Sequence, residues 1–233
     1  MAQALSVTDV AFAFLLVAIV GIIQWRTGGR YWTTLHASVR MVVQLLAVGF
    51  VLVYIFEAGN TWVNLLVVVV MLTVAGYIAM RPVQDRSLQH YGLLLLSLIA
   101  GGLLSLLYVL FSVFEQGFPF EPRFAIPLAG MSIANAMNTL SQVAERYDAE
   151  RAHEQPPRQA RATAFEAAML PRVNGMFAVG LVSLPGMMTG QILSGVSPLL
   201  AVRYQVVIMC LLFGAAGIAA SVYLRLRERF SSS

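Results

Sequence analysis

The chain has 233 residues, of which 59% are hydrophobic and only 11% are charged, and its formal net charge at pH 7 is +4. Soluble domains carry about 25% charged residues, so this composition indicates an integral membrane protein and excludes an ordinary soluble enzyme. All 15 basic residues are arginine. Without lysine the chain has no P-loop and no lysine catalyst, so any ATP would have to be hydrolysed by another chain.

Seven apolar stretches are long enough to cross a bilayer, which takes roughly 20 apolar residues. In chain order they cover residues 7–25, 38–56, 62–80, 91–114, 124–142, 173–193 and 199–224. We therefore predict an all-α integral membrane protein, a polytopic bundle of seven transmembrane helices forming a single domain over residues 1–233. The start of the chain shows neither a basic region nor a small-residue cleavage site, so we predict no cleaved signal peptide.

The link between the first two stretches has an amphipathic pattern. Tyr31, Trp32, Leu35 and Val39 fall on roughly one face of a possible helix. This pattern is typical of a short helix that lies in the membrane interface, so we expect an elbow helix before the second span.

The stretch at 124–142 carries polar side chains at helical spacing. They are Met131, Asn135, Asn138 and Gln142, while Gly130 and Ala134 form a small-residue surface beside them. Amides that face lipid are costly, so this stripe is expected to face protein or water.

The segment at 143–172 is the longest charged part of the chain and is predicted to link two spans in the cytoplasm. Its first part extends the preceding helix, and Pro156-Pro157 breaks that helix. A short second helix over about residues 160–170 is then expected to lead back into the membrane.

The stretch at 173–193 interrupts an apolar run with Pro185, and Gly186 and Gly190 form a GxxxG pair. Backbone groups freed by a proline in lipid need partners inside the protein, so this helix is expected to kink and to line a cavity or another helix. We predict that it forms a transport pathway together with the stretch at 124–142. The predicted pathway residues are Met131, Asn135, Asn138, Met187, Met188 and Gln191.

Met187 and Met188 offer soft thioether sulfur, and the nearby amides offer oxygen, a mixture that could touch a metal ion without holding it tightly. The alternative is that the methionines are adaptable packing residues and that the amides join helices.

Arginines predict the orientation, because cytoplasmic loops carry the basic excess. They follow the first, third, fifth and seventh stretches as Arg26 and Arg30, then Arg81 and Arg86, then Arg146, Arg151, Arg158, Arg161 and Arg172, and finally Arg225, Arg227 and Arg229. Only Arg123 and Arg203 fall on the other side. We therefore predict an N-terminus outside and a C-terminus in the cytoplasm. The basic charge reflects this topology, so no nucleic-acid partner is expected.

The string LVSLPGMMTGQIL, together with GVSPL and AVRYQ after it and IPLAGM and NAMN before it, resembles the FetB-type iron-export permeases of ABC transporters, a family that includes plant aluminium-resistance proteins. The resemblance implies a permease domain in the cell (inner or plasma) membrane and no cofactor in this chain. It also implies two further partners besides the lipid bilayer, a cytoplasmic ABC ATPase that binds ATP and a second permease copy. The Glu-Ala-Ala triplet of the link resembles an ABC coupling element, which implicates Arg161, Phe165 and Glu166 in ATPase docking.

Three functions remain open. The first is ABC export of metal ions such as iron, or of another small solute such as a nucleotide-sugar. The second is secondary transport, for which carboxylates well inside the membrane are expected. The acidic residues instead sit at the ends of the apolar stretches or in loops, as Asp9, Glu57, Asp85, Glu115 and Glu121. The third is a membrane partner that does not itself transport.

Overall fold

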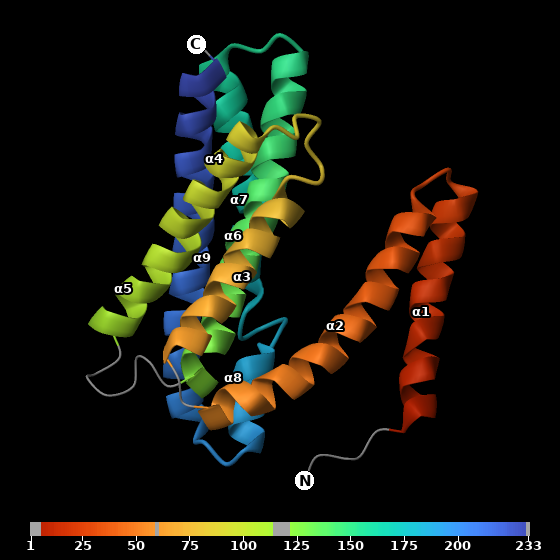
Figure 1. Ribbon diagram of the computed structural model, residues 1–233, viewed down its shortest axis with the longest axis vertical. Coiled ribbons are helices and arrows are strands. Elements are labelled where there is room, and N and C mark those ends of the chain that lie inside the picture. The colour runs from red at the N-terminus through yellow and green to blue at the C-terminus, as the bar shows by residue number, and fades with distance from the viewer. Residues whose placement is uncertain (1–5, 59–60, 114–121, 232–233) are drawn as a thin grey trace. The chain divides into compact units, whose positions relative to one another are not determined.

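The computed structural model describes residues 6–58, 61–113 and 122–231, and these ranges are almost entirely helical (Figure 1). The chain divides into two compact units, residues 1–59 and residues 60–233, which are described separately. The all-α fold predicted from the sequence is confirmed for the described residues.

The first unit is a pair of helices, α1 (Val7–Arg26) and α2 (Tyr31–Ala58). α1 begins with a capping box, in which the Ser6 hydroxyl accepts from the Asp9 backbone N–H. The predicted elbow helix is wrong, because α2 runs without a break from Tyr31 into the apolar stretch. No proline interrupts these residues, so the amphipathic beginning and the apolar run propagate as one helix.

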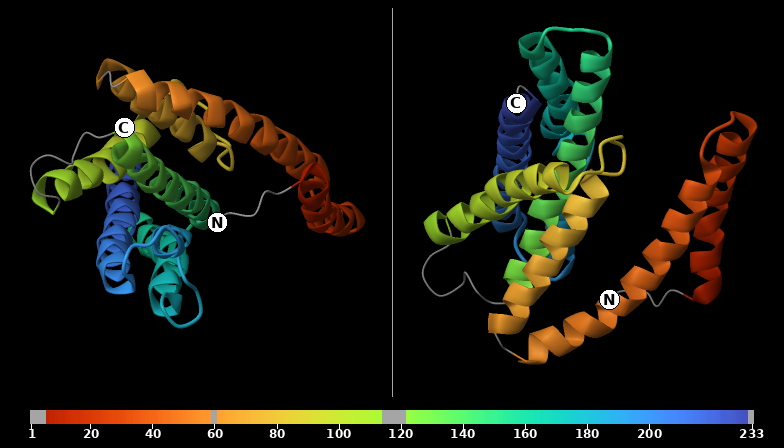
Figure 2. Two further views of the ribbon diagram at one scale, coloured as in Figure 1. Left: turned by 90° about the horizontal axis from the view of Figure 1, so that it is seen from below. Right: turned by 45° about the horizontal axis from the view of Figure 1, so that its top comes forward.

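The second unit holds the remaining helices. They are α3 (Thr61–Ala79), α4 (Leu88–Leu98), the π-helical turn η1 (Ile99–Leu103), α5 (Leu104–Ser112), α6 (Pro122–Ala152), α7 (Pro157–Ala178), α8 (Gly186–Leu193) and α9 (Pro198–Ser231). α6 and α9 run side by side at the centre, with α3 and α7 packed against α6 and with α4 and η1 packed against α9 (Figures 1 and 2). The two central helices therefore organise the unit.

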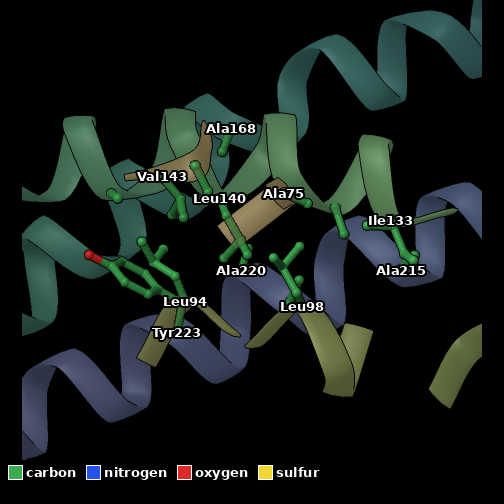
Figure 3. Close-up of a cluster of buried hydrophobic side chains, with 14 of the residues drawn as sticks. Ala75, Leu94, Leu98, Ile133, Leu140, Val143, Ala168, Ala215, Ala220 and Tyr223 are labelled. Atoms are coloured by element: carbon green, nitrogen blue, oxygen red, sulfur yellow. The ribbon is translucent and has the colours of Figure 1, made fainter. Parts of the chain in front are cut away.

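Small side chains line the contacts between these helices (Figure 3). Ala75 of α3, Ala168 of α7 and Ala215 and Ala220 of α9 are buried next to larger residues such as Leu94 of α4. Lipid tails are as apolar as leucine, so membrane helices associate through close packing more than through the hydrophobic effect. Alanine at these positions lets the helix backbones approach each other.

The closest approach is at η1. A Cβ atom built on Gly101 would lie 2.6 Å from the backbone nitrogen of Ala219 on α9, and nearer still to the carbonyl oxygen of Ala215. Only glycine fits here, and the wider π-helical turn presents it to α9.

Five helical stretches are long and apolar enough to cross a membrane among the described residues, namely Thr8–Arg26, Tyr31–Val53, Trp62–Ala79, Leu88–Ser112 and Pro198–Phe230. The protein is therefore a membrane protein with several apolar helices. The predicted number of seven spans is not confirmed. The stretch at 124–142 lies within α6, which carries the polar stripe and a charged end. α6 is not among the five helical stretches that are long and apolar enough to cross a membrane.

The predicted continuous helix at 173–193 is wrong. α7 ends at Ala178, and α8 begins only at Gly186, with Pro185 as its N-cap. Between them Gly180 has a φ of +85°, which is left-handed backbone that favours glycine. The N–H groups of Val182 and Ser183 turn back to the Ala178 carbonyl at 2.8 and 3.1 Å, so the segment is broken rather than kinked.

The link at 143–172 is also organised differently from the prediction. α6 continues to Ala152, and α7 begins at Pro157, so the break at Pro156-Pro157 is confirmed. The short helix expected over 160–170 is wrong, because α7 has 22 residues and passes through Pro171. Pro157 occupies the first position of α7, where a proline is favourable because its missing N–H would have no partner within the helix.

Candidate functional site

A polar contact joins α6, α7 and α9 inside the second unit. The guanidinium of Arg172 on α7 donates from Nη1 to the amide oxygen of Asn135 at 2.6 Å, and from Nε to the hydroxyl oxygen of Thr139 at 3.1 Å. The Asn135 amide nitrogen in turn donates to the carbonyl oxygen of Leu212 on α9 at 2.5 Å. Asn135 therefore accepts from one helix and donates to another, which fixes its orientation.

This contact lies deep along the apolar span of α9. Leu212 follows the first residue of α9, Pro198, by 14 residues, or about 21 Å at roughly 1.5 Å per residue, within the apolar span Pro198–Phe230. The half-buried Arg172 is therefore level with the middle of a membrane-spanning helix. A charged residue at that depth is rare and marks a functional site by default.

A cavity of about 160 Å³ adjoins the guanidinium. Besides Asn135 and Arg172, its walls include Met176 of α7 and Met209 and Phe213 of α9. The cavity thus combines one positive charge and one amide with apolar walls, as small-ligand sites do.

The sequence pattern places Arg172 in the cytoplasmic link and does not predict this position inside the bundle. The signal that could have found it is a helical period, since Ala160, Ala164, Ala168 and Arg172 follow each other at intervals of four residues. The three alanines are fully buried against neighbouring helices. Residues four apart share one face of a helix, so Arg172 continues the buried face of α7.

The predicted pathway residues of α6 are not equivalent. Met131 is partly buried and packs against the core. The Asn135 side chain is hydrogen-bonded to Arg172 and to the Leu212 carbonyl, whereas Asn138 is exposed. The stripe of four residues therefore spreads across the helix surface instead of facing one cavity.

On α8, Met187 is partly buried against the core and Met188 is half-buried. The side-chain oxygen of Gln191 is buried and has no hydrogen-bond partner among the described residues, and the same is true of Gln205 on α9. α8 packs against α9, whereas no extensive contact joins α8 to α6 in the part of the chain that is described. The structure therefore does not bring the predicted pathway residues of α6 together with those of α8.

The glycines predicted to mediate helix packing differ from one another in their surroundings. A Cβ atom at Gly130 on α6 would lie 3.1 Å from the Met71 side chain of α3, so Gly130 lies at a close contact. Gly186 and Gly190 are exposed, and a Cβ atom on either would meet nothing within 4 Å. These two glycines of α8 therefore do not pack against α6.

The α3–α4 link, the α6–α7 turn and the C-terminal end of α9 lie at the same end of the unit (Figure 1), and charged side chains form ion pairs there. Arg227 of α9 pairs with Asp85 of the α3–α4 link at 3.1 Å and with Asp148 of α6 at 3.5 Å. The Ser87 backbone N–H, which donates to Asp85 at 3.0 Å, lowers the pKa of that carboxyl group, and Arg227 lowers it further against partial burial. Asp85 is therefore ionised at neutral pH. Through Asp85 and Asp148, Arg227 holds the α3–α4 link, α6 and α9 together.

The predicted coupling residues lie near this charged end on α7. Arg161 is engaged by Glu228 of α9 at 2.8 Å, and Phe165 is partly buried against the core, whereas Glu166 is exposed. A charged hollow of about 490 Å³, lined by residues that include Asp85, Asp148 and Arg227, opens nearby. Of the three predicted residues, Glu166 is the one whose side chain is free to reach a partner.

No group of three or more histidine, cysteine or acidic side chains that could hold a metal ion is found among the described residues.

Comparison with known proteins gives a consistent assignment. Residues 7–230 match the model of a family described as "Uncharacterised protein family (UPF0014)". A UPF0014 membrane protein of Synechocystis is 36% identical, covering 90% of this chain and 88% of that relative. Protein ALUMINUM SENSITIVE 3 of Arabidopsis thaliana is 35% identical, covering 82% of this chain and 74% of that relative. Probable iron export permease protein FetB of Escherichia coli K12 is 30% identical, covering 83% of this chain and 80% of that relative.

No solved structure matches the chain. The resemblance inferred from the sequence motifs is confirmed by these relatives, which include both FetB and a plant aluminium-sensitivity protein. With a family model matched from residue 7 to residue 230, the chain belongs to the UPF0014 family of membrane proteins.

Proposed function

We propose that this chain is the membrane-spanning permease of an ABC exporter, acting as a homodimer with a separate cytoplasmic ATPase that binds ATP. The observation that carries the proposal is the 30% identity, over 83% of the chain, to a protein named as a probable iron export permease. The broken passage from α7 to α8 supports it, because interrupted helices in membrane proteins line cavities and substrate sites. The chain itself would perform no chemistry, and its role would be to open and close a path.

The proposal includes a topology in which α6 and the α7–α8 segment also cross the membrane, with the N-terminus outside and the C-terminus in the cytoplasm. The α3–α4 link, the α6–α7 turn and the end of α9 lie at one end of the second unit, which supports one common side of the membrane for them (Figure 1). The arginines of these segments favour the cytoplasm as that side. A reporter fused after Arg229 is expected to be active only in the cytoplasm. Activity confined to the exterior would contradict the topology.

ATP-dependent flux tests the function directly. Vesicles that contain the permease and its copurified ATPase are expected to move iron with ATP and not without it. Flux driven by an ion gradient without ATP would indicate a secondary transporter. Absence of flux for iron, other metals and nucleotide-sugars alike would indicate a membrane partner that does not transport.

We expect Glu166 to contact the ATPase, because its side chain is exposed on α7 and it follows by five residues Arg161, which pairs with Glu228 at the charged end. Glu166→Arg reverses its charge and should lower ATPase copurification several-fold while leaving the permease inserted. Arg203→Gln, at the exposed beginning of α9, serves as the control and should copurify normally. Equal copurification of the Glu166→Arg and Arg203→Gln proteins would exclude this contact.

The metal proposal concerns Met187 and Met188, with the unpaired Gln191 oxygen beside them. Replacing both methionines with leucine keeps the volume and removes the sulfur, so metal export should fall while folding and ATPase association remain intact. Met41→Leu on α2 removes an exposed sulfur elsewhere and should export normally. Full metal export by the double variant would leave these methionines as packing residues.

The dimer proposal concerns Gly186 and Gly190, which present a small exposed surface on α8. Small residues let a second copy approach closely, so Gly190→Leu is expected to shift the dimer to monomer in detergent, as measured by light scattering. Gly49→Leu on α2, where a Cβ atom also meets nothing within 4 Å, is the control. A Gly190→Leu protein that remains dimeric would reject this interface.

A further inference from the structure

Arg172 carries a charge that no carboxylate among the described residues neutralises. Its two hydrogen bonds within the chain go to the neutral oxygens of Asn135 and Thr139, and none of the ion pairs among the described residues includes it. A guanidinium has five N–H donors, so three remain after these two bonds. A charge removed from water is costly unless it is paired, which leaves this position suited to an anion.

The surroundings of Arg172 orient it as a binding group. Asn135 is fixed by its bond to the Leu212 carbonyl, and Thr139 is fully buried, so the two acceptors hold the guanidinium in one place. The adjoining cavity of about 160 Å³ has methionine and phenylalanine side chains on its other walls. Apolar walls lower the local dielectric and strengthen the attraction of an arginine for a carboxylate or phosphate.

The same geometry disfavours a bare metal cation at this point. The oxygen of Asn135, one of the predicted pathway residues, accepts from Arg172 at 2.6 Å. A cation that approached this oxygen would meet the guanidinium and be repelled.

We propose that Arg172, held by Asn135 and Thr139, binds an anionic carboxylate or phosphate group of the transported solute at the middle of the bundle. This inference rests on the proposed transport function and narrows its cargo. A metal would pass this site as a complex with an anionic organic ligand, and an organic solute would pass it through its own acidic group.

The test uses the full chain in nanodiscs of phosphatidylcholine, without ATPase, and measures equilibrium binding of radiolabelled citrate and inorganic phosphate. We expect saturable binding that weakens as salt rises. Arg172→Gln should weaken anion binding at least tenfold. Arg172→Lys keeps the positive charge but loses the paired N–H donors of the planar guanidinium, so it should weaken anion binding less. Arg158→Gln, at the exposed beginning of the same helix, should bind as the wild type does.

Two outcomes would overturn the site, namely no saturable binding by the wild type, or equal binding by a folded Arg172→Gln protein. If that variant does not fold, chemical labelling of the wild-type protein by an arginine-specific dicarbonyl tests whether Arg172 binds the anion. Citrate or phosphate should slow modification of Arg172 and not of Arg158, and an unchanged rate at Arg172 would contradict the proposal. Protection by phosphatidylglycerol in the bilayer, with none by citrate or phosphate, would assign the site to lipid and equally contradict it.

The outcome is separable from that of the proposed function. Loss of anion binding with intact ATP-dependent flux would remove only this site. Anion binding without any ATP-dependent flux would remove only the exporter.

Discussion

Replacement of Gly101 with valine is expected to lower the free energy of unfolding by on the order of 3 kcal/mol, the upper end of what overpacking costs. The added atoms would collide with the Ala215 carbonyl oxygen and the Ala219 backbone nitrogen of α9. Both belong to a helix backbone, which cannot move aside as the end of a flexible side chain can. α9 would have to separate from η1, and the alanine contacts beside it would be lost as well.

The measurement is the thermal unfolding midpoint of the purified protein in detergent, together with the folded fraction recovered from the membrane. Gly92→Val on α4 is the matched control, because a Cβ atom at Gly92 meets nothing within 4 Å. Gly102→Ala should cost less than Gly101→Val, since its Cβ atom would lie 3.4 Å from Ile133, an ordinary contact. A Gly101→Val protein as stable as Gly92→Val would contradict the close approach.

The elements that follow from local chemistry could be predicted from the sequence. Five of the predicted apolar stretches correspond to helical stretches that are long and apolar enough to cross a membrane, two properties that can be read directly from a sequence. The turn at Pro156-Pro157 was also predicted, because a proline cannot continue the hydrogen bonds of a helix.

The break between α7 and α8 depends on more than its proline. Pro185 suggested a kink at one residue, but the helix ends at Ala178, well before it. The Gly180 backbone and the bonds that return to the Ala178 carbonyl determine where the chain leaves the helix. Pro171 shows the converse, since it lies inside α7 without ending it. A proline therefore indicates a weak point, and the packing around it decides whether the helix stops.

Arg172 shows why the candidate site could be predicted only in part. Its neighbours in sequence include Arg158 and Arg161, which made it resemble one more loop arginine. Its neighbours in space are Asn135 and Thr139, which come from another helix. The sequence identified Asn135 as a polar residue that needs a partner, but nothing local in the chain specifies which partner the fold supplies.

Loss of the Tyr223 hydroxyl is expected to have the second large effect on stability. The Tyr223 hydroxyl and the His90 Nε2 atom are 2.9 Å apart, and both side chains are almost completely buried between α4 and α9. The other ring nitrogen of His90 lies 3.4 Å from Asp85 without a hydrogen bond. Tyr223→Phe would leave His90 with neither nitrogen bonded, and an unpaired buried polar group costs about 1–3 kcal/mol.

A double-mutant cycle separates this cost from the loss of packing. His90→Phe should destabilise the protein as well, because it leaves the Tyr223 hydroxyl buried and unpaired. The double variant removes both polar groups and keeps two stacked rings, so it should be more stable than the sum of the single effects by about 1 kcal/mol or more. Tyr108→Phe on α5, where the ring is exposed, should change the unfolding midpoint little. Strictly additive effects of the two single changes would mean that His90 and Tyr223 contribute to the bundle only through their volume.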